Sequence, residues 1–499
     1  MYVEIEEWLI SIPTTALLIM LGNIVLSKAP IVGCILRSLG FLSIALLIKG
    51  LDFFSEILLI TSSIVGIALA FYTYAYSKAR YGGVGLTPLI DIFLFSMVML
   101  FRAKTFIEFI MFWLLIELIA FLLIAYDYIA REDVNPLRAS IKYLIFSMIP
   151  TDLSLFILLA MIGFEEAFVT PITLLKLRIA NPTILIIVLL GFFSKAAVIP
   201  LHFWLPDAHS VAPSPASALL SGLMVKMGIY GLYLTANQVI DEVLAAITMI
   251  LLGGLTAVYG AAQASIQQDI KRLLAYSTTS ETGILSIALG LYILSKDSIF
   301  ITASALYSVA HALYKAFMFM DSGYIEVNIH KRNINELGFI HRVSPIQSTS
   351  VLMSVTSYLG MPPSIGFLAK LVLFAGISKY LGNSYTYLVA LTILILKIAI
   401  SIIYNAVYLK AHFGKESLTT FPKPILSRED KYFKASCTTM SIYPYIITLP
   451  LVMLSIYSGS ISIKLKALDI LYPLILVLTA ISLIALYPLI YAILKYRGS

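Results

Sequence analysis

Apolar segments long enough to cross a lipid bilayer recur from one end of the sequence to the other. A membrane-spanning helix needs about 20 mostly apolar residues. Of the 499 residues, 60% are hydrophobic and 12% are charged, whereas soluble domains carry about 25% charged residues. A water-soluble core could not hold this much apolar sequence. The sequence therefore predicts an all-α, polytopic membrane protein.

About fifteen spans are predicted from these segments. They lie approximately at residues 8–26, 30–49, 54–77, 87–101, 105–128, 138–163, 182–205, 212–235, 240–265, 270–294, 299–325, 346–379, 384–410, 440–460 and 468–494. The start of the chain, MYVEIEEW, is acidic and lacks the basic region of a signal peptide. We therefore interpret the first apolar segment as a retained helix.

The distribution of basic residues predicts the orientation of the chain. If the N-terminus lies outside, the segments on the inside carry about twice as many Lys and Arg residues as those outside, as the positive-inside rule requires. This places the 411–437 loop and the C-terminus in the cytoplasm, with the protein in the cell membrane. The pI near 9.0 has the same cause, so we expect no nucleic-acid partner.

The motifs of common cofactor sites are missing from the sequence. With two cysteines in all, Cys34 and Cys437, the chain cannot supply the roughly four thiolates of an iron–sulfur cluster. No HExxH, P-loop or GxGxxG stands in a credible context. We therefore expect no cofactor or metal in this chain.

Two of the predicted spans are interrupted in a similar way. The seventh contains FFSKAAVIPLHFWLP and the twelfth contains GMPPSIGFLAK, so each combines a lysine, proline and small residues inside an apolar segment. Paired interrupted helices in corresponding positions indicate an internal repeat with a site at the repeat interface. The two lie five spans apart, and an offset of five inverts the second copy relative to the first.

Ionisable side chains occur within several spans, where each costs roughly 2.5–3.5 kcal/mol on insertion scales. The candidates for ion translocation are Glu117, Lys195, Lys226, His311, Lys315, Lys370 and Lys397. For Lys397 a local ion pair is an equal alternative. We interpret Asp152 and Glu281 as helix-packing or near-interface groups. Asp207 and His209 lie in a Pro-flanked turn, where they either fix the loop or admit protons.

The chemistry of these residues favours proton transfer. Burial disfavours the charged form of an amine, whereas an adjacent carboxylate favours it, so a buried Lys–Glu pair can act as a proton switch. Lysines in series, linked by histidine and water, would then form a lateral proton wire. His311 suits a relay because the ordinary pKa of histidine is about 6.5. Lys315 lies four residues further along the same helix face.

The stretch FFSKAAVIPLHFWLPDAHSVAPSPASALLSGLMVKMGIYGLY resembles the signature of the antiporter-like membrane subunits. These subunits occur in respiratory complex I (NADH-quinone oxidoreductase), in Mrp-type cation/proton antiporters and in membrane-bound energy-converting hydrogenases. Supporting stretches are FWLLIEL, QQDIKRLLAYSTTSETG, HALYKAFMFM and GMPPSIGFLAK. They follow the order of the family and cover about residues 86 to 411.

The resemblance implies fourteen or more helices with two inverted five-helix repeats, each holding a broken helix. The expected parts are N-terminal helices at 1–85, a first repeat at 86–235, a second at 236–411, and a cytoplasmic loop with C-terminal helices at 412–499. Only two spans follow that loop, so we expect the long lateral helix of the most distal complex I subunit to be absent.

The resemblance also implies roles for individual residues. Glu117 and Lys195 match the coupling pair of the first half-channel, and Lys226 matches the bridging lysine of the next helix. His311 and Lys315 fall on the His-x-x-x-Lys helix of the family. Lys370 matches the charged residue of the second broken helix, which is glutamate in some branches, whereas Lys397 lies outside the core motif.

These inferences lead to an expected function and an alternative to it. We expect a proton-translocating subunit of a complex I-type oxidoreductase, driven by electron transfer in partner subunits. Iron–sulfur clusters and a flavin or nickel–iron centre would lie in those partners. The alternative is an Mrp-type Na⁺/H⁺ antiporter subunit or a hydrogenase membrane subunit. The partners in each case are other membrane subunits, the lipid bilayer, and H⁺ or Na⁺.

Overall fold

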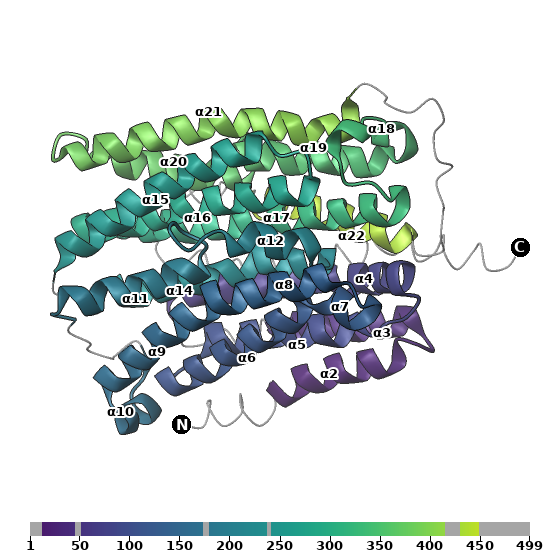
Figure 1. Cartoon of the computed structure of the whole chain (residues 1–499), viewed down its shortest axis with the longest axis horizontal. Helices are drawn as coiled ribbons and strands as arrows, with labels where there is room; N and C mark the ends of the chain where they lie inside the picture. Colours follow the sequence, from purple (N-terminus) through teal and green to yellow (C-terminus); the bar gives the residue numbers. More distant parts are fainter. Residues whose placement is uncertain (1–11, 45–50, 173–178, 237–240, 415–429, 449–499) are drawn as a thin grey trace, which may run out of the picture.

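Helices run side by side across the molecule in the computed structural model, which describes residues 12–44, 51–172, 179–236, 241–414 and 430–448 (Figure 1). Parts of the first and fourteenth predicted spans, most of the 411–437 loop and the whole of the last span lie outside the described residues. The described elements up to the middle of the chain are α2 (Ile12–Val25), α3 (Pro30–Ser43), α4 (Phe53–Tyr81), α5 (Leu86–Arg102), α6 (Phe106–Ile124), α7 (Tyr126–Arg131), α8 (Val134–Tyr143), η3 (Leu144–Met148), α9 (Ile149–Ile162), α10 (Phe164–Val169), α11 (Pro182–Lys195), α12 (Trp204–Val211), α13 (Ser214–Leu219), η5 (Leu220–Met224) and α14 (Val225–Ala236).

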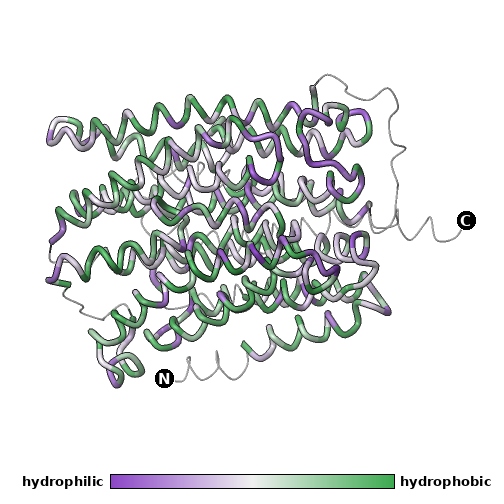
Figure 2. Tube along the Cα trace, in the orientation of Figure 1, coloured by the Kyte–Doolittle hydropathy of each residue, from purple (hydrophilic) through white to green (hydrophobic). Residues whose placement is uncertain are grey.

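The second half continues in the same manner. Its elements are α15 (Glu242–Ser265), α16 (Ile270–Ser295), α17 (Ser298–Ile329), η6 (Ile334–Glu336), α18 (Ile340–Val343), α19 (Pro345–Leu359), α20 (Ile365–Lys379), α21 (Tyr385–Phe413) and α22 (Asp430–Ile446). Among the described residues, six continuous helical segments are long and apolar enough to cross a membrane. Hydrophobic residues predominate along the outer helices, and hydrophilic ones gather toward helix ends and loops (Figure 2). The protein is therefore a multi-pass membrane protein.

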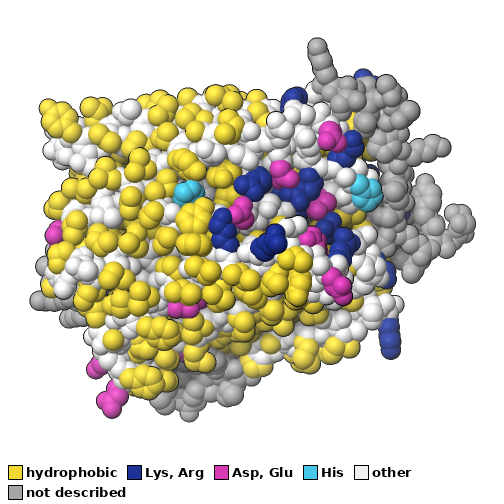
Figure 3. Space-filling view, in the orientation of Figure 1, with side chains coloured by type: hydrophobic (Ala, Val, Ile, Leu, Met, Phe, Trp, Pro, Cys, Tyr) yellow, Lys and Arg dark blue, Asp and Glu magenta, His cyan; other side chains and the backbone are white. Residues whose placement is uncertain are grey.

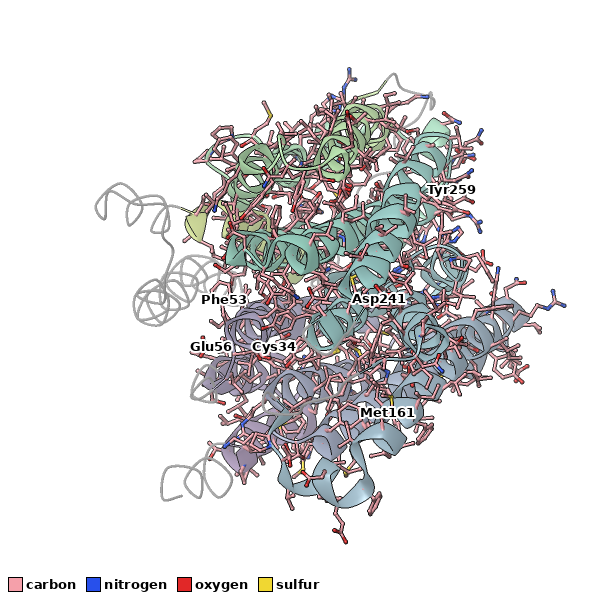
Figure 4. The ribbon with its side chains drawn as sticks, turned by 90° about the vertical axis from the view of Figure 1, so that its left-hand side faces the viewer. Cys34, Phe53, Glu56, Met161, Asp241 and Tyr259 are labelled. Atoms are coloured by element: carbon pink, nitrogen blue, oxygen red, sulfur yellow. The ribbon has the colours of Figure 1, made fainter. Side chains whose placement is uncertain are left out.

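Two sets of five spans follow one another along the chain. The first set is α5, α6, α8–η3–α9, α11–α12 and α13–η5–α14, and the second is α15, α16, α17, α19–α20 and α21. The fourth span of each set is broken, as the sequence predicts. Because five is an odd number, the second set begins on the opposite side of the membrane and is inverted. The first set lies in the lower half of the molecule and the second in the upper half, in the side view of Figure 1 and in the view along the helices of Figure 4.

Polar side chains determine where many of the spans begin. The Asp52 carboxylate accepts hydrogen bonds from the first backbone N–H groups of α4. The carboxylates of Asp269 and Asp297 do the same at α16 and α17. These N–H groups have no partner within their own helix, so an acidic cap at the aqueous end satisfies them and favours the helix dipole.

A buried ion pair joins the first helices to the first repeat. Arg37 on α3 and Asp91 on α5 are both fully buried, with Nε 2.5 Å from Oδ2 and Nη2 2.7 Å from Oδ1. The Arg37 guanidinium also donates to the backbone carbonyl of Ala70 at 2.6 Å, and Asn23 donates to Asp91 at 2.6 Å. This bidentate geometry satisfies both charges, so we assign the pair a structural role.

Replacing Asp91 with alanine is expected to destabilise the protein by about 3–5 kcal/mol, because a buried guanidinium would lose its counter-ion. Thermal unfolding of the detergent-solubilised protein measures this change. The matched variant Arg37→Met/Asp91→Leu removes both charges and should restore most of the lost stability. An unchanged unfolding temperature for Asp91→Ala would contradict this assignment.

Candidate functional site

The first broken helix ends α11 at Lys195, deep inside the protein. The chain then turns through Ala197, which has a positive φ of 55°, before α12 begins at Trp204. A break of this kind frees carbonyl groups at membrane depth, and these need partners. The indole N–H of Trp204 donates to the carbonyl of Ser194 at 2.8 Å. The break is therefore bridged by the first residue of the following half-helix.

Lys195 meets Glu117 at this break. The Nζ atom of Lys195 lies 2.6 Å from Oε1 of Glu117 on α6, and both side chains have no exposed surface. The indole of Trp113 donates to the same oxygen at 3.0 Å. Lys195 also donates to the Tyr143 hydroxyl at 3.1 Å, next to the π-helical turn η3. The structure thus places the two residues of the first predicted pair in direct contact.

Asp152 on α9 stands close to this pair, which the sequence analysis did not anticipate. It interacts electrostatically with Glu117 and Lys195, and it is half-buried. Oε2 of Glu117 and Oδ1 of Asp152 have no hydrogen-bond partner among the described residues. Two carboxylates that lie close together favour a state in which one of them is protonated, so Glu117 and Asp152 could share a proton. Its position on the third span, between the spans of Glu117 and Lys195, is the sequence signal that could have indicated it.

Lys226 connects the first repeat to the second. Its Nζ atom lies 2.5 Å from Nδ1 of His311 on α17 and donates to the carbonyl of Ser221 at 3.0 Å. Ser221 lies in the π-helical turn η5, and such turns are frequent at functional sites. Both Lys226 and His311 are fully buried. Within the part of the chain that the structure describes, no hydrogen bond joins Lys226 to Lys195.

Three lysines of the second repeat surround the ring of Tyr358. The Nζ atoms of Lys315, Lys397 and Lys370 lie 4.9, 5.4 and 5.9 Å from its centroid, respectively. The Tyr358 hydroxyl lies 2.5 Å from that of Tyr404. Lys315 donates to the Ser277 hydroxyl and to the carbonyl of Leu274 at 3.3 Å. The aromatic face supplies a weak attraction to all three cations.

Lys370 reaches back over the second break. This break separates α19 from α20, and Lys370 Nζ donates to the backbone carbonyl of Tyr358 at 2.6 Å. Gly360 has a φ of 78°, and a Cβ there would lie 2.8 Å from Cδ of Lys370. Glycine at this position therefore permits both the left-handed turn and the path of the lysine. A cation at the C-terminal end of α19 also fits the helix dipole.

Lys397 forms a second buried ion pair, and its partner is Glu281. The Lys397 ammonium contacts Oε1 of Glu281, both side chains have no exposed surface, and the Tyr307 hydroxyl donates to Oε2. Glu281 therefore packs α16 against α21 through an ion pair, and its full burial corrects the interpretation of a near-interface position. The polar run around it, STTSETG, gave it the appearance of a span end. Lys397 in mid-span was the signal that a buried carboxylate must face it.

Asp207 and His209 at the turn after the first break have separate environments. Asp207 is paired with Lys142 at 2.5 Å and Arg272 at 3.1 Å, at about one-third exposure. His209 is fully buried and stacks on Phe319 with centroids 4.5 Å apart. Charged side chains gather on one part of an otherwise largely hydrophobic face (Figure 3). Asp207 therefore fixes the turn against neighbouring helices.

The described residues hold no group of three or more His, Cys, Asp and Glu side chains that could bind a metal ion. What the arrangement can do is hold and pass protons. Among the described residues, one carboxylate–lysine pair without exposed surface lies in each repeat, and the Lys226–His311 contact lies between them.

The sequence matches a family model described as "NADH:quinone oxidoreductase/Mrp antiporter, TM" over residues 103–401. The putative antiporter subunit mnhA2 of Staphylococcus saprophyticus is 30% identical over 87% of this chain and 55% of its own length. Hydrogenase-4 component B of Escherichia coli is 29% identical over 64% of this chain and 49% of its own length. NADH-quinone oxidoreductase subunit L of Rickettsia bellii is 28% identical over 64% and 50%. The chain spans about half the length of these relatives.

Solved structures show the same fold. A chain of the Mrp complex from Dietzia sp. DQ12-45-1b superposes with a TM-score of 0.71 at 19% identity, over 94% of this chain and 95% of that one. A chain of the membrane-bound sulfane sulfur reductase, an archaeal respiratory membrane complex, gives 0.72 at 19% identity, over 88% and 76%. These similar proteins are subunits of multi-subunit membrane complexes.

Proposed function

Because the chain belongs to the NADH:quinone oxidoreductase/Mrp antiporter transmembrane family, we propose that it is the proton-translocating, antiporter-like subunit of a complex I-type oxidoreductase. The observation that carries this proposal is the Glu117–Lys195 ion pair, which is fully buried at the end of a broken helix. A buried ion pair adds little stability compared with apolar residues of similar volume. Unlike the Arg37–Asp91 pair, this pair also leaves one carboxylate oxygen, Oε2 of Glu117, without a hydrogen-bond partner among the described residues, which favours a functional role.

The pair would act as a switch for one proton. While Glu117 contacts Lys195, its negative charge stabilises the ammonium form of the lysine. If the pair separates, the buried ammonium is left without a counter-ion, and loss of its proton becomes favourable. Lys226, His311 and Lys315 lead from the first repeat toward Lys370 and Lys397 in the second. Protons would pass laterally along this series through hydroxyl groups and water.

Electron transfer in partner subunits would supply the energy for separating the pair. The chain itself would carry no cofactor, and iron–sulfur clusters with a flavin or nickel–iron centre would lie in those partners. The orientation with a cytoplasmic C-terminus is supported by basic residues at one end of the bundle. Arg80, Lys271 and Arg332 belong to this group and pair there with acidic residues.

The alternative is an Mrp-type Na⁺/H⁺ antiporter subunit, which is favoured by the 87% coverage of this chain in the alignment with the staphylococcal antiporter subunit. Both functions would use the same buried residues. They differ in their partners, since an antiporter needs no redox protein.

Mass spectrometry of the detergent-solubilised native complex separates these functions. We expect iron–sulfur or other redox subunits to co-purify with this chain in stable proportion. Small membrane subunits without any redox protein would instead support the antiporter. A scaffold role would predict that Lys370→Gln lowers the yield of the complex and leaves transport per complex unchanged.

A further inference from the structure

The ionisable residues of the two repeats occupy matching spans. In the first repeat, Glu117 is on the second span, Lys195 on the fourth and Lys226 on the fifth. In the second repeat the second, fourth and fifth spans are α16, α20 and α21. They carry, in the same order, Glu281, Lys370 and Lys397. Glu117, Lys195 and Lys226 thus stand on spans that correspond to those of Glu281, Lys370 and Lys397.

The two repeats nevertheless pair these residues differently. In the first, Glu117 contacts the lysine of the fourth span, Lys195. In the second, Glu281 contacts the lysine of the fifth span, Lys397. Lys195 stands at the end of the half-helix before the break, whereas Lys370 stands on the half-helix after it. The carboxylate of the second span is thus paired with the lysine of the fourth span in one repeat and of the fifth span in the other.

The surroundings of Glu281 make such an exchange physically accessible. Lys370 and Lys397 lie at the same tyrosine ring, with their Nζ atoms 5.9 and 5.4 Å from the centroid of Tyr358. The Lys370 ammonium donates to an uncharged group, the Tyr358 carbonyl, at 2.6 Å. The residue is only 7% exposed. A buried ammonium without a counter-ion is costly. A protonated Lys370 would therefore draw Glu281 away from Lys397.

Tyr307 is placed to hold the carboxylate during this movement. Its hydroxyl donates to Oε2 of Glu281 and accepts from Nζ of Lys397 at 3.2 Å. This leaves Oε1 as the oxygen that contacts Lys397. Glu281 can therefore release Lys397 from Oε1 while it keeps the hydrogen bond from Tyr307.

We propose that Glu281 is a second proton-switching carboxylate and that it alternates between Lys397 and Lys370. The inference rests on the proposed function and adds a residue to the same relay. In the alternation, one N–H bond of the Lys397 ammonium breaks to leave a neutral amine. One N–H bond forms on the neutral amine of Lys370, and Glu281 moves to the new ammonium. One proton passes from Lys397 to Lys370, and the total charge of the three groups is unchanged.

The test is transport by the native complex reconstituted into liposomes, with assembly measured on native gels and the proton gradient read with a pH-sensitive dye. The central variant is Glu281→Gln/Lys397→Gln, which removes both members of the ion pair together. Transport per assembled complex should fall by at least about tenfold, as for loss of an acid–base group. The control is Arg37→Gln/Asp91→Asn, which neutralises an equally buried pair and should leave transport per complex at the wild-type rate.

Wild-type transport by the assembled Glu281→Gln/Lys397→Gln variant would overturn the inference. If that variant does not assemble, Glu281→Asp takes its place: it keeps the charge on a side chain one methylene shorter, which should impair alternation between the two lysines. Transport reduced by at least about threefold supports the alternation, and an unchanged rate overturns it.

Glu117→Gln is measured in parallel. If Glu117→Gln is inactive while the Glu281 variants are active, this inference fails and the proposed function stands; if all are active, the proposed function fails.

Discussion

Coupled proton translocation is expected to fall by about 100-fold or more when Lys195 is replaced by alanine or Glu117 by glutamine, because each change removes one half of an acid–base pair. Electron transfer should become uncoupled or slow in the same variants. The measurement is the proton gradient formed per electron transferred by the assembled complex in liposomes. Proton pumping at the wild-type level with normal assembly would disprove the role of this pair.

A matched control for this prediction is the exposed ion pair of Lys296 and Glu242. Its atoms lie 2.8 Å apart, and the two side chains are 46% and 47% exposed. Exposed pairs contribute about 0–1 kcal/mol, so Lys296→Ala should alter neither stability nor pumping appreciably. The comparison separates the loss of a lysine from the loss of a buried lysine.

Loss of the contact between the repeats is expected to have the second-largest effect. Lys226→Ala and His311→Ala should each lower translocation by about 10–100-fold, since a proton could no longer pass between the halves by the 2.5 Å contact. If the two residues act as one unit, the double variant should be hardly worse than either single variant. The same liposome assay measures all three.

Two outcomes would contradict this second prediction. Effects of Lys226→Ala and His311→Ala that multiply in the double variant would show that the residues act separately. Wild-type transport by either assembled single variant would show that protons cross between the repeats elsewhere. Arg37→Gln/Asp91→Asn again serves as the control for general damage to a buried polar contact.

Much of the fold could be predicted from the sequence because the cost of placing a residue in lipid is local. Each span is a run of apolar residues, and both broken helices carry proline and glycine within such a run. The charges of Glu117, Lys195 and Lys226 were noticeable for the same reason, since each stands alone among apolar neighbours. Glu281 was interpreted as a packing or near-interface group because serine and threonine surround it, and Asp152 because it lies near the proline at the start of α9.

The sequence by itself determined the membrane class, the two interrupted spans and most of the residues that carry charge inside them. Only the tertiary structure decided which carboxylate meets which lysine. Lys397 and Glu281 are 116 positions apart in the chain, and their contact depends on how α16 and α21 are rotated and packed. Helical periodicity gives the relative directions of side chains on one helix, but it does not say which face of another helix stands opposite. The different pairings in the two repeats are therefore a property of helix packing.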